Sequence, residues 1–116
     1  MITIMPADKA FLEQVSAPAG ADAMVLRDND GTVFGHALFT VAGERAEILS
    51  VCTDEPLMTE GLIRAVINAA DYRGATHAVC GVEALIPTLK RLEFTWQEGI
   101  YTVDVHNFLY GECKCK

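Results

Sequence analysis

The stretch that decides the fold is Ile48–Gly74, which reads ILSVCTDEPLMTEGLIRAVINAADYRG. Its first residues are densely apolar, which is typical of a buried strand. From Pro56 the apolar residues recur three and four positions apart, and this spacing predicts a helix over 56–72 that ends before Gly74. A second apolar run at 76–80 follows, so the stretch predicts a strand–helix–strand unit with two parallel strands. The apolar helix positions are Leu62, Ile63, Val66, Ile67 and Ala70.

The segments on either side of this unit favour antiparallel strands. Turn signals at Asp30-Gly31 and Gly43 divide residues 23–53 into a three-stranded meander. The predicted order is β-α-β-β-β-α-β-α-β-β, an α/β (α+β) fold whose mixed, mostly antiparallel sheet surrounds a central βαβ unit. The expected strands are 1–5, 24–27, 32–41, 45–52, 76–80, 94–96 and 100–108, and the expected helices are 7–15, 56–72 and a segment on the face of Val82, Leu85, Leu89 and Leu92.

Composition limits the classes of partner. The 116 residues, 51% hydrophobic, predict one globular domain over 1–116. A net charge of −7 opposes nucleic-acid and anionic-membrane binding, and the closest cationic cluster is only Lys90-Arg91. The first twenty residues lack the features of a signal peptide, and no stretch approaches the roughly 20 apolar residues of a membrane span. We therefore expect a cytoplasmic protein whose four cysteines are reduced.

Ligands of open sheets usually bind beyond the carboxyl ends of parallel strands, near the N-terminus of the next helix. For this chain that rule places the candidate cleft at 51–61 and 79–83.

The element order and the stretch Ile48–Gly74 resemble the GNAT superfamily of N-acetyltransferases. The stretch is similar to the family's fourth strand, acyl-CoA pyrophosphate loop and following helix. Residues 84–94, ALIPTLKRLEF, resemble the family's late helix. The resemblance covers nearly the whole chain. It implies acetyl-CoA as donor and a small amine or a protein amine as acceptor.

The pyrophosphate loop of that family is written [QR]-x-x-G-x-[GA], and here it falls on Pro56 to Gly61, of which only Gly61 matches. Three acids, Asp54, Glu55 and Glu60, stand where a diphosphate would dock, and each opposes it by on the order of 1 kcal/mol. Alternatively, the pair Asp54-Glu55 caps the helix with its carboxylates. The resemblance gives the candidate cofactor-binding residues as Val51, Thr53, Thr59, Gly61 and Arg64.

The catalytic candidate is Glu47, on the strand where the family often carries a general base. The alternative is an outward polar residue of an alternating strand. The tyrosine that the family often uses as a general acid falls on Leu89, which cannot donate a proton. The family's Asn and Gly fall on Val82 and Glu93. Tyr101 and Tyr110 are the candidates to replace the missing acid.

The cysteines support a separate hypothesis. Cys52 and Cys80 are expected at the ends of neighbouring strands, as a thiol site or, as we favour, as small buried hydrophobes. The tail pair Cys113-x-Cys115 is a metal candidate, completed by His77, Cys80 or His106, or a frayed reduced tail. We assign no metal site.

Three functions follow from these observations. The first is an acetyl-CoA-dependent N-acyltransferase. The second is a GNAT-fold binding or regulatory module without CoA chemistry, with a homodimer as one form. The third is a cysteine-based metal or redox protein. The acceptor, the oligomeric state and the pathway are not readable from the sequence.

Overall fold

A computed structural model of the chain describes residues 2–53 and 55–111. Within these residues, seven strands form one sheet in the order β1-β2-β3-β4-β5-β7-β6, and only β4 and β5 are parallel. The elements are β1 (Thr3–Pro6), α1 (Lys9–Gln14), β2 (Asp22–Arg27), β3 (Val33–Ala42), β4 (Arg45–Thr53), α2 (Leu57–Tyr72), β5 (His77–Cys80), the 3-10 turn η1 (Glu83–Leu85), α3 (Ile86–Arg91), β6 (Thr95–Gln97), β7 (Ile100–Asp104) and α4 (Val105–Tyr110).

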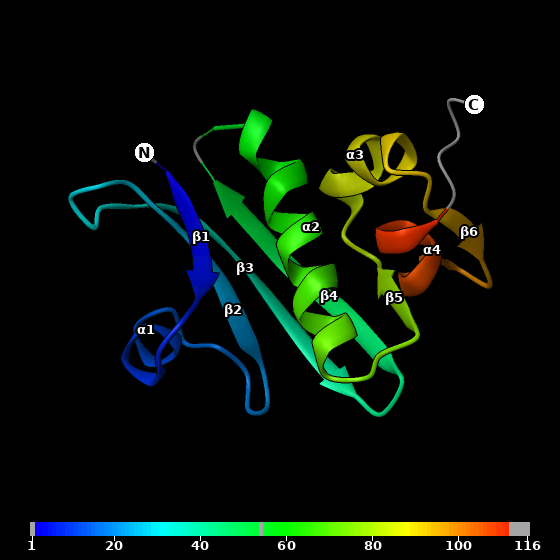
Figure 1. The fold of residues 1–116 in the computed structure, drawn as a ribbon, viewed down its shortest axis with the longest axis horizontal. Coiled ribbons are helices and arrows are strands. Elements are labelled where there is room, and N and C mark those ends of the chain that lie inside the picture. Colours follow the sequence, from blue (N-terminus) through cyan, green and yellow to red (C-terminus); the bar gives the residue numbers. More distant parts are fainter. Residues whose placement is uncertain (1, 54, 112–116) are drawn as a thin grey trace.

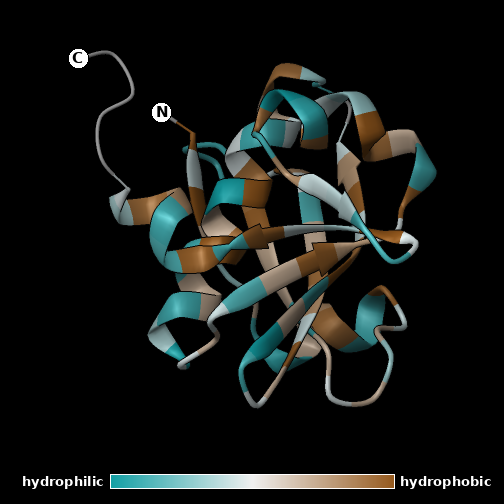
Figure 2. Ribbon diagram, turned by 90° about the vertical axis from the view of Figure 1, so that its right-hand side faces the viewer, coloured by the Kyte–Doolittle hydropathy of each residue, from teal (hydrophilic) through white to brown (hydrophobic). Residues whose placement is uncertain are grey.

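The helices divide between the two faces of the sheet. The main core lies on the face that α2, α3 and α4 cover, and α2 crosses in front of β4 (Figure 1). A smaller cluster on the opposite face joins Phe11 of α1 to Ala23 and Val25 of β2. Each helix carries both hydrophobic and hydrophilic residues (Figure 2), as helices with one buried side do.

The predicted βαβ unit is confirmed. Its helix α2 buries the five apolar positions that the spacing selected: Leu62, Ile63, Val66, Ile67 and Ala70. β4 and β5 pair in parallel from Arg45 opposite His77 to Ile48 opposite Cys80. The mixed, mostly antiparallel sheet is also as predicted. No helix among the described residues is both long and apolar enough to cross a membrane.

The C-terminal prediction is wrong in one element. Residues 105–108 were expected to continue a strand, but β7 ends at Asp104 and α4 follows. The Asp104 side chain accepts a hydrogen bond of 2.8 Å from the Asn107 N–H, which caps the new helix. Val105 then enters the core on the α2 side, fully buried. A capping Asp before a short apolar run was the signal that the strand interpretation passed over.

The end of α3 is a left-handed turn made by a residue other than glycine. Glu93 has φ 70°, its N–H bonds to the Lys90 carbonyl, and the Phe94 N–H bonds to the Leu89 carbonyl. These two bonds form the helix-ending motif in which glycine is preferred, because a side chain crowds the backbone at positive φ. The structure therefore explains why the resemblance places a Gly at this position.

We expect Glu93→Gly to be more stable than Glu93→Ala by about 1 kcal/mol in urea unfolding. Both variants remove the same carboxylate, so its contacts cancel in the comparison and the difference reports the backbone strain relieved by glycine less the extra backbone entropy that glycine loses on folding. Equal stabilities would show that the strain at Glu93 does not exceed that entropy cost.

Candidate active site

The parallel strands β4 and β5 separate at a defined point, and we call the opening the fork. β5 ends at Cys80, opposite Ile48, whereas β4 continues to Thr53. The register between β3 and β4 shifts at the same place, leaving Leu49 as an extra residue that bends β4. Figure 1 shows β4 running past the end of β5. The fork consists of residues 49–53 of β4 and residues 81–82 after β5.

Within the fork, β4 has β3 on one side and, among the described residues, no strand on the other. The five residues span about 17 Å at the rise of a strand. Backbone N–H and C=O groups of such an edge favour an extended ligand that pairs with them.

Four of the predicted cofactor residues surround the β4–α2 junction, at one end of the fork. Val51 is half-buried and packs against the main core, and Thr53 is the last residue of β4. Thr59 and Gly61 lie in the first turns of α2. A Cβ added to Gly61 would lie 3.6 Å from Cδ1 of Ile4, so this side of Gly61 faces β1.

The loop before α2 satisfies its own backbone. The Glu55 N–H donates to Oγ1 of Thr53 (3.1 Å), and the Glu55 carbonyl accepts from the Met58 N–H (2.9 Å). The Thr59 N–H donates to the carbonyl of Pro56 (3.2 Å), and proline has no N–H to offer. The expected cap by the Glu55 carboxylate is absent from the described residues, where α2 has no side-chain cap. Asp54, the other acid of that expectation, lies outside them.

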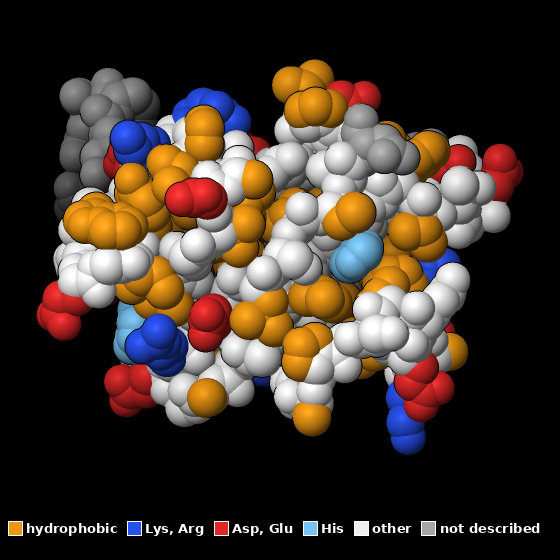
Figure 3. Space-filling model, turned by 180° about the vertical axis from the view of Figure 1, so that it is seen from behind, with side chains coloured by type: hydrophobic (Ala, Val, Ile, Leu, Met, Phe, Trp, Pro, Cys, Tyr) orange, Lys and Arg blue, Asp and Glu red, His pale blue; other side chains and the backbone are white. Residues whose placement is uncertain are grey.

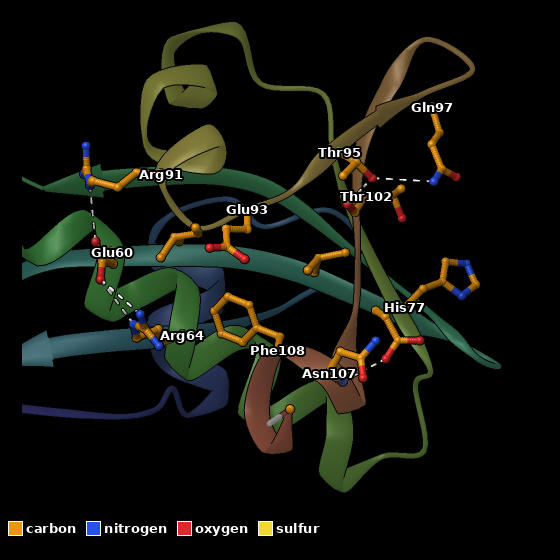
Figure 4. Close-up of a pocket in the computed structure, with 14 residues that line it drawn as sticks. Glu60, Arg64, His77, Arg91, Glu93, Thr95, Gln97, Thr102, Asn107 and Phe108 are labelled. Atoms are coloured by element: carbon orange, nitrogen blue, oxygen red, sulfur yellow. Dashed lines mark hydrogen bonds and ion pairs between the residues drawn. The ribbon is translucent and has the colours of Figure 1, made fainter. Parts of the chain in front are cut away.

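The Arg64 guanidinium has two partners within the described part of the chain. It donates to Oε2 of Glu60 at 3.2 and 3.3 Å and lies 5.2 Å from the centre of the Phe108 ring of α4. Arg91 of α3 reaches the other oxygen of the same carboxylate, with Nε 3.4 Å from Oε1 (Figure 4). Glu60 thus pairs with two arginines and ties α3 to α2.

Glu47 lies on the opposite face from α2. Its neighbours Ala46 and Ile48 are buried in the main core, so the alternating pleat directs the half-buried Glu47 to the other side. Hydrophobic and uncharged side chains cover most of the middle of that face, with charged ones mainly toward its edges (Figure 3). Glu47 stands one rung before the fork opens and opposite Val79 of β5.

The Cys80 thiol lies at the base of the fork, fully buried. Burial raises its pKa, a hydrogen bond from the Val82 backbone N–H partly opposes this, and the negative charge of Glu47 adds to it. The thiol is therefore protonated at neutral pH and is a poor nucleophile.

Cys52 differs from its expected position. We expected a small buried hydrophobe, but its residue is exposed. It pairs with His36 of β3 and lies four residues beyond Ile48, the partner of Cys80. The two cysteines are therefore offset by about 13 Å along β4 and form no joint thiol site.

This difference predicts a selective alkylation. With iodoacetamide at pH 8, Cys52 should be modified at least about tenfold faster than Cys80, because only an accessible thiolate reacts. Peptide mass spectrometry resolves the two positions and separates them from the tail cysteines. If Cys80 and Cys52 were alkylated at similar rates in the native protein, Cys80 would be accessible and the prediction would be wrong.

The remaining metal and acid candidates are dispersed. The described residues hold no group of three or more His, Cys, Asp or Glu side chains that could bind a metal. The tail cysteines Cys113 and Cys115 lie outside those residues. Leu89, at the resemblance's tyrosine position, is fully buried in the core.

The two tyrosine candidates lie in different environments. The Tyr110 hydroxyl donates to Asp71, near the end of α2, at 2.9 Å, and this bond and the carboxylate charge raise its pKa. Tyr101 is the cross-strand partner of Cys80 and stacks edge-on against Trp96. Tyr101 is thus the tyrosine beside the end of β5.

A separate cleft of about 900 Å³ lies at the β7–β6 end of the sheet, between α2, α3, β6, β7 and α4. Figure 4 shows Glu60 with its two arginines at one end and Asn107 and His77 at the other. Among the described residues, its lining includes none of the fork. The charges of its lining are mixed, because Glu60, Glu93 and Asp104 line it together with the two arginines.

No protein-family model and no curated protein sequence matches the chain. Solved structures do. A spermidine N-acetyltransferase variant from Vibrio cholerae matches with a TM-score of 0.75 at 8% identity, over 94% of this chain and 96% of that one. The ribosomal-protein-S18-alanine N-acetyltransferase of Escherichia coli matches with a TM-score of 0.71 at 14% identity, over 90% of this chain and 94% of that one. A GNAT family acetyltransferase from Elizabethkingia anophelis, solved with acetyl-CoA bound, matches with a TM-score of 0.66 at 14% identity, over 89% of this chain and 97% of that one.

These matches confirm the predicted resemblance at the level of architecture. The chain has the fold of GNAT acetyltransferases, including the βαβ unit around which the fork opens. At identities this low the likeness concerns the fold, and the chemistry depends on the residues of this chain.

Proposed function

We propose that the chain is a cytosolic N-acyltransferase that moves an acetyl group from a thioester to an amine. The observation that carries the proposal is the fork, where no described strand pairs with β4, in a fold shared with solved acetyltransferases. The thioester donor would lie along residues 49–53, and the amine would approach from the face that carries Glu47.

The proposed step needs one proton acceptor. The amine nitrogen attacks the thioester carbonyl, the new C–N bond forms and the C–S bond breaks. The proton lost by the nitrogen passes to the Glu47 carboxylate, directly or through one water. The departing thiolate takes its proton from solvent, or from Tyr101 if that hydroxyl turns into the fork.

The donor implied by the fold is acetyl-CoA, which one solved structural neighbour binds. The backbone of residues 49–53 and the half-buried side chain of Val51 are suited to the amide-bearing arm of such a thioester. Thr53, Thr59, Gly61 and Arg64 are the proposed contacts toward its far end.

The test is a thiol-release assay with the purified chain. Acetyl-CoA and S-acetylpantetheine are each offered at millimolar concentration with a panel of amines that includes spermidine and a peptide with an N-terminal alanine. Amine-dependent thiol release, with an acetyl group found on the amine by mass spectrometry, is the expected result. Release that does not depend on any amine would sink the proposal.

A second function is favoured by the β4–α2 loop. Because the N–H groups of Glu55, Met58 and Thr59 are bonded within the chain, the same fold could serve as a binding module without CoA chemistry. That function predicts no binding of either thioester in calorimetry at millimolar ligand. Binding of either one by calorimetry would exclude it.

A further inference from the structure

The loop that would hold a diphosphate offers it few donors. A helix N-terminus binds phosphate through backbone N–H groups that point outward and have no other partner. Here the N–H groups of Glu55, Met58 and Thr59 each donate to an oxygen of the loop itself. Pro56, between them, has none. A diphosphate would have to break these bonds before it could form its own.

The acidic residues that follow β4 and β5 also oppose a diphosphate. Glu55 is exposed beside α2, and Glu83 is exposed at the start of η1, after β5. Arg64, the cation expected from the resemblance, and Arg91 are both bound to the Glu60 carboxylate. Moving either arginine to a phosphate would leave Glu60 partly unpaired in a chain whose net charge is already −7. The residues present therefore do not fit the nucleotide end of acetyl-CoA.

The interior of the fork has the opposite character. Its walls are Val51 and Val82, both half-buried against the core, and the neutral thiol of Cys80 lies at its base. Among the described residues no strand pairs with this edge of β4, so alternate residues of 49–53, those whose N–H and C=O groups do not face β3, offer amide donors and acceptors to the fork. An uncharged pantetheine arm, with its two amides and a terminal thioester, matches this lining without any phosphate.

We propose that the acyl donor of this chain is a pantetheine thioester recognised by its arm alone, with the nucleotide diphosphate contributing no binding. The inference rests on the proposed acyl transfer and narrows its donor. It replaces the cofactor contacts expected at Thr59 and Arg64 by contacts within the fork.

The first experiment compares S-acetylpantetheine with acetyl-CoA on the full chain, by calorimetry and by kcat/KM with the best amine. We expect the dissociation constants and the kcat/KM values of the two donors to agree within about threefold. A diphosphate held by several charge-assisted bonds would instead favour acetyl-CoA by about 100-fold or more. An advantage of that size for acetyl-CoA would overturn the inference and leave the acyl transfer standing. Failure of both donors to bind or react would instead overturn the acyl transfer, and the inference with it.

Ionic strength supplies an independent reading. Salt screens charge interactions between partly exposed groups. If the loop repels the diphosphate, raising the salt concentration from about 50 to about 500 mM should leave the affinity for S-acetylpantetheine unchanged and increase the affinity for acetyl-CoA. Weaker acetyl-CoA binding at high salt would mean attraction, which contradicts the inference.

The variant Glu60→Gln tests the role of the two arginines. It removes the carboxylate that binds Arg64 and Arg91, so both become available to phosphate. Acetyl-CoA should then bind about fivefold to tenfold more tightly, while the affinity for S-acetylpantetheine stays the same. The control is Glu13→Gln on α1, which changes the net charge equally on the other face of the sheet. An equal gain in both variants, or none in Glu60→Gln, would count against the inference.

Discussion

Phe39→Ala is expected to lower the free energy of unfolding by about 3–5 kcal/mol. Phe39 lies on β3 with 1% of its surface exposed, among the largest side chains of the main core. Its truncation removes apolar burial and leaves a cavity between the sheet and α2, which the surrounding helices cannot fill without moving. The guanidinium carbon of Arg73, 5.5 Å from the ring centre, would lose its aromatic contact as well.

The matched control lies on the same strand. Phe34 is 37% exposed near the start of β3, and Phe34→Ala should cost less than about 1 kcal/mol. Urea unfolding followed by circular dichroism gives both values under one condition. Similar losses in the two variants would mean that the packing around Phe39 is not the main source of stability in this sheet.

The sequence predicted the part of the fold that local patterns determine. The spacing of Leu62, Val66 and Ala70 selects the buried side of α2, and all three are fully buried. Gly31 and Gly43 have φ of 83° and 62°, so the turns that divide the meander need the conformation that glycine adopts most easily.

The parts it did not predict depend on contacts between distant segments. Residues 105–110 form too short a run for periodicity to separate a strand from a helix; the capping Asp104 is a local signal for the helix, and Val105 is buried in the main core. The bend at Leu49 that opens the fork has no residue signal either, because it arises from a shift in register against β3.

In the candidate site, too, some contacts can be predicted from the local sequence and others depend on the fold. A Glu60–Arg64 pair is readable from the sequence, since residues four apart on a helix are neighbours. The second arginine, Arg91, comes from 31 positions further along the chain, and only the fold brings it to Glu60. The contact of Arg64, a cofactor candidate from the resemblance, with the Phe108 ring of α4 likewise joins residues that are distant in the sequence.

Glu47→Gln is expected to reduce acetyl transfer by about 10²–10⁴-fold in kcat, with little change in thioester binding. Glutamine keeps the size and polarity of the half-buried side chain but cannot accept the proton that the amine must lose. The fork itself would be unaltered, since residues 49–53 and Cys80 keep their places. Steady-state kinetics with S-acetylpantetheine and calorimetry with the same ligand separate the rate from the affinity.

Two further variants distinguish chemistry from structure. Glu47→Asp retains a carboxylate on a shorter side chain, so it should recover part of the rate that Glu47→Gln loses. Glu13→Gln removes a carboxylate from α1 and should leave the rate unchanged, because Glu13 is exposed and remote from β4 and β5. If Glu47→Gln and Glu47→Asp were equally slow while both bound the thioester normally, the side chain would act by position alone. If neither variant slowed the transfer, the proton would leave through water without this residue, and the face of the sheet opposite α2 would not be where the amine reacts.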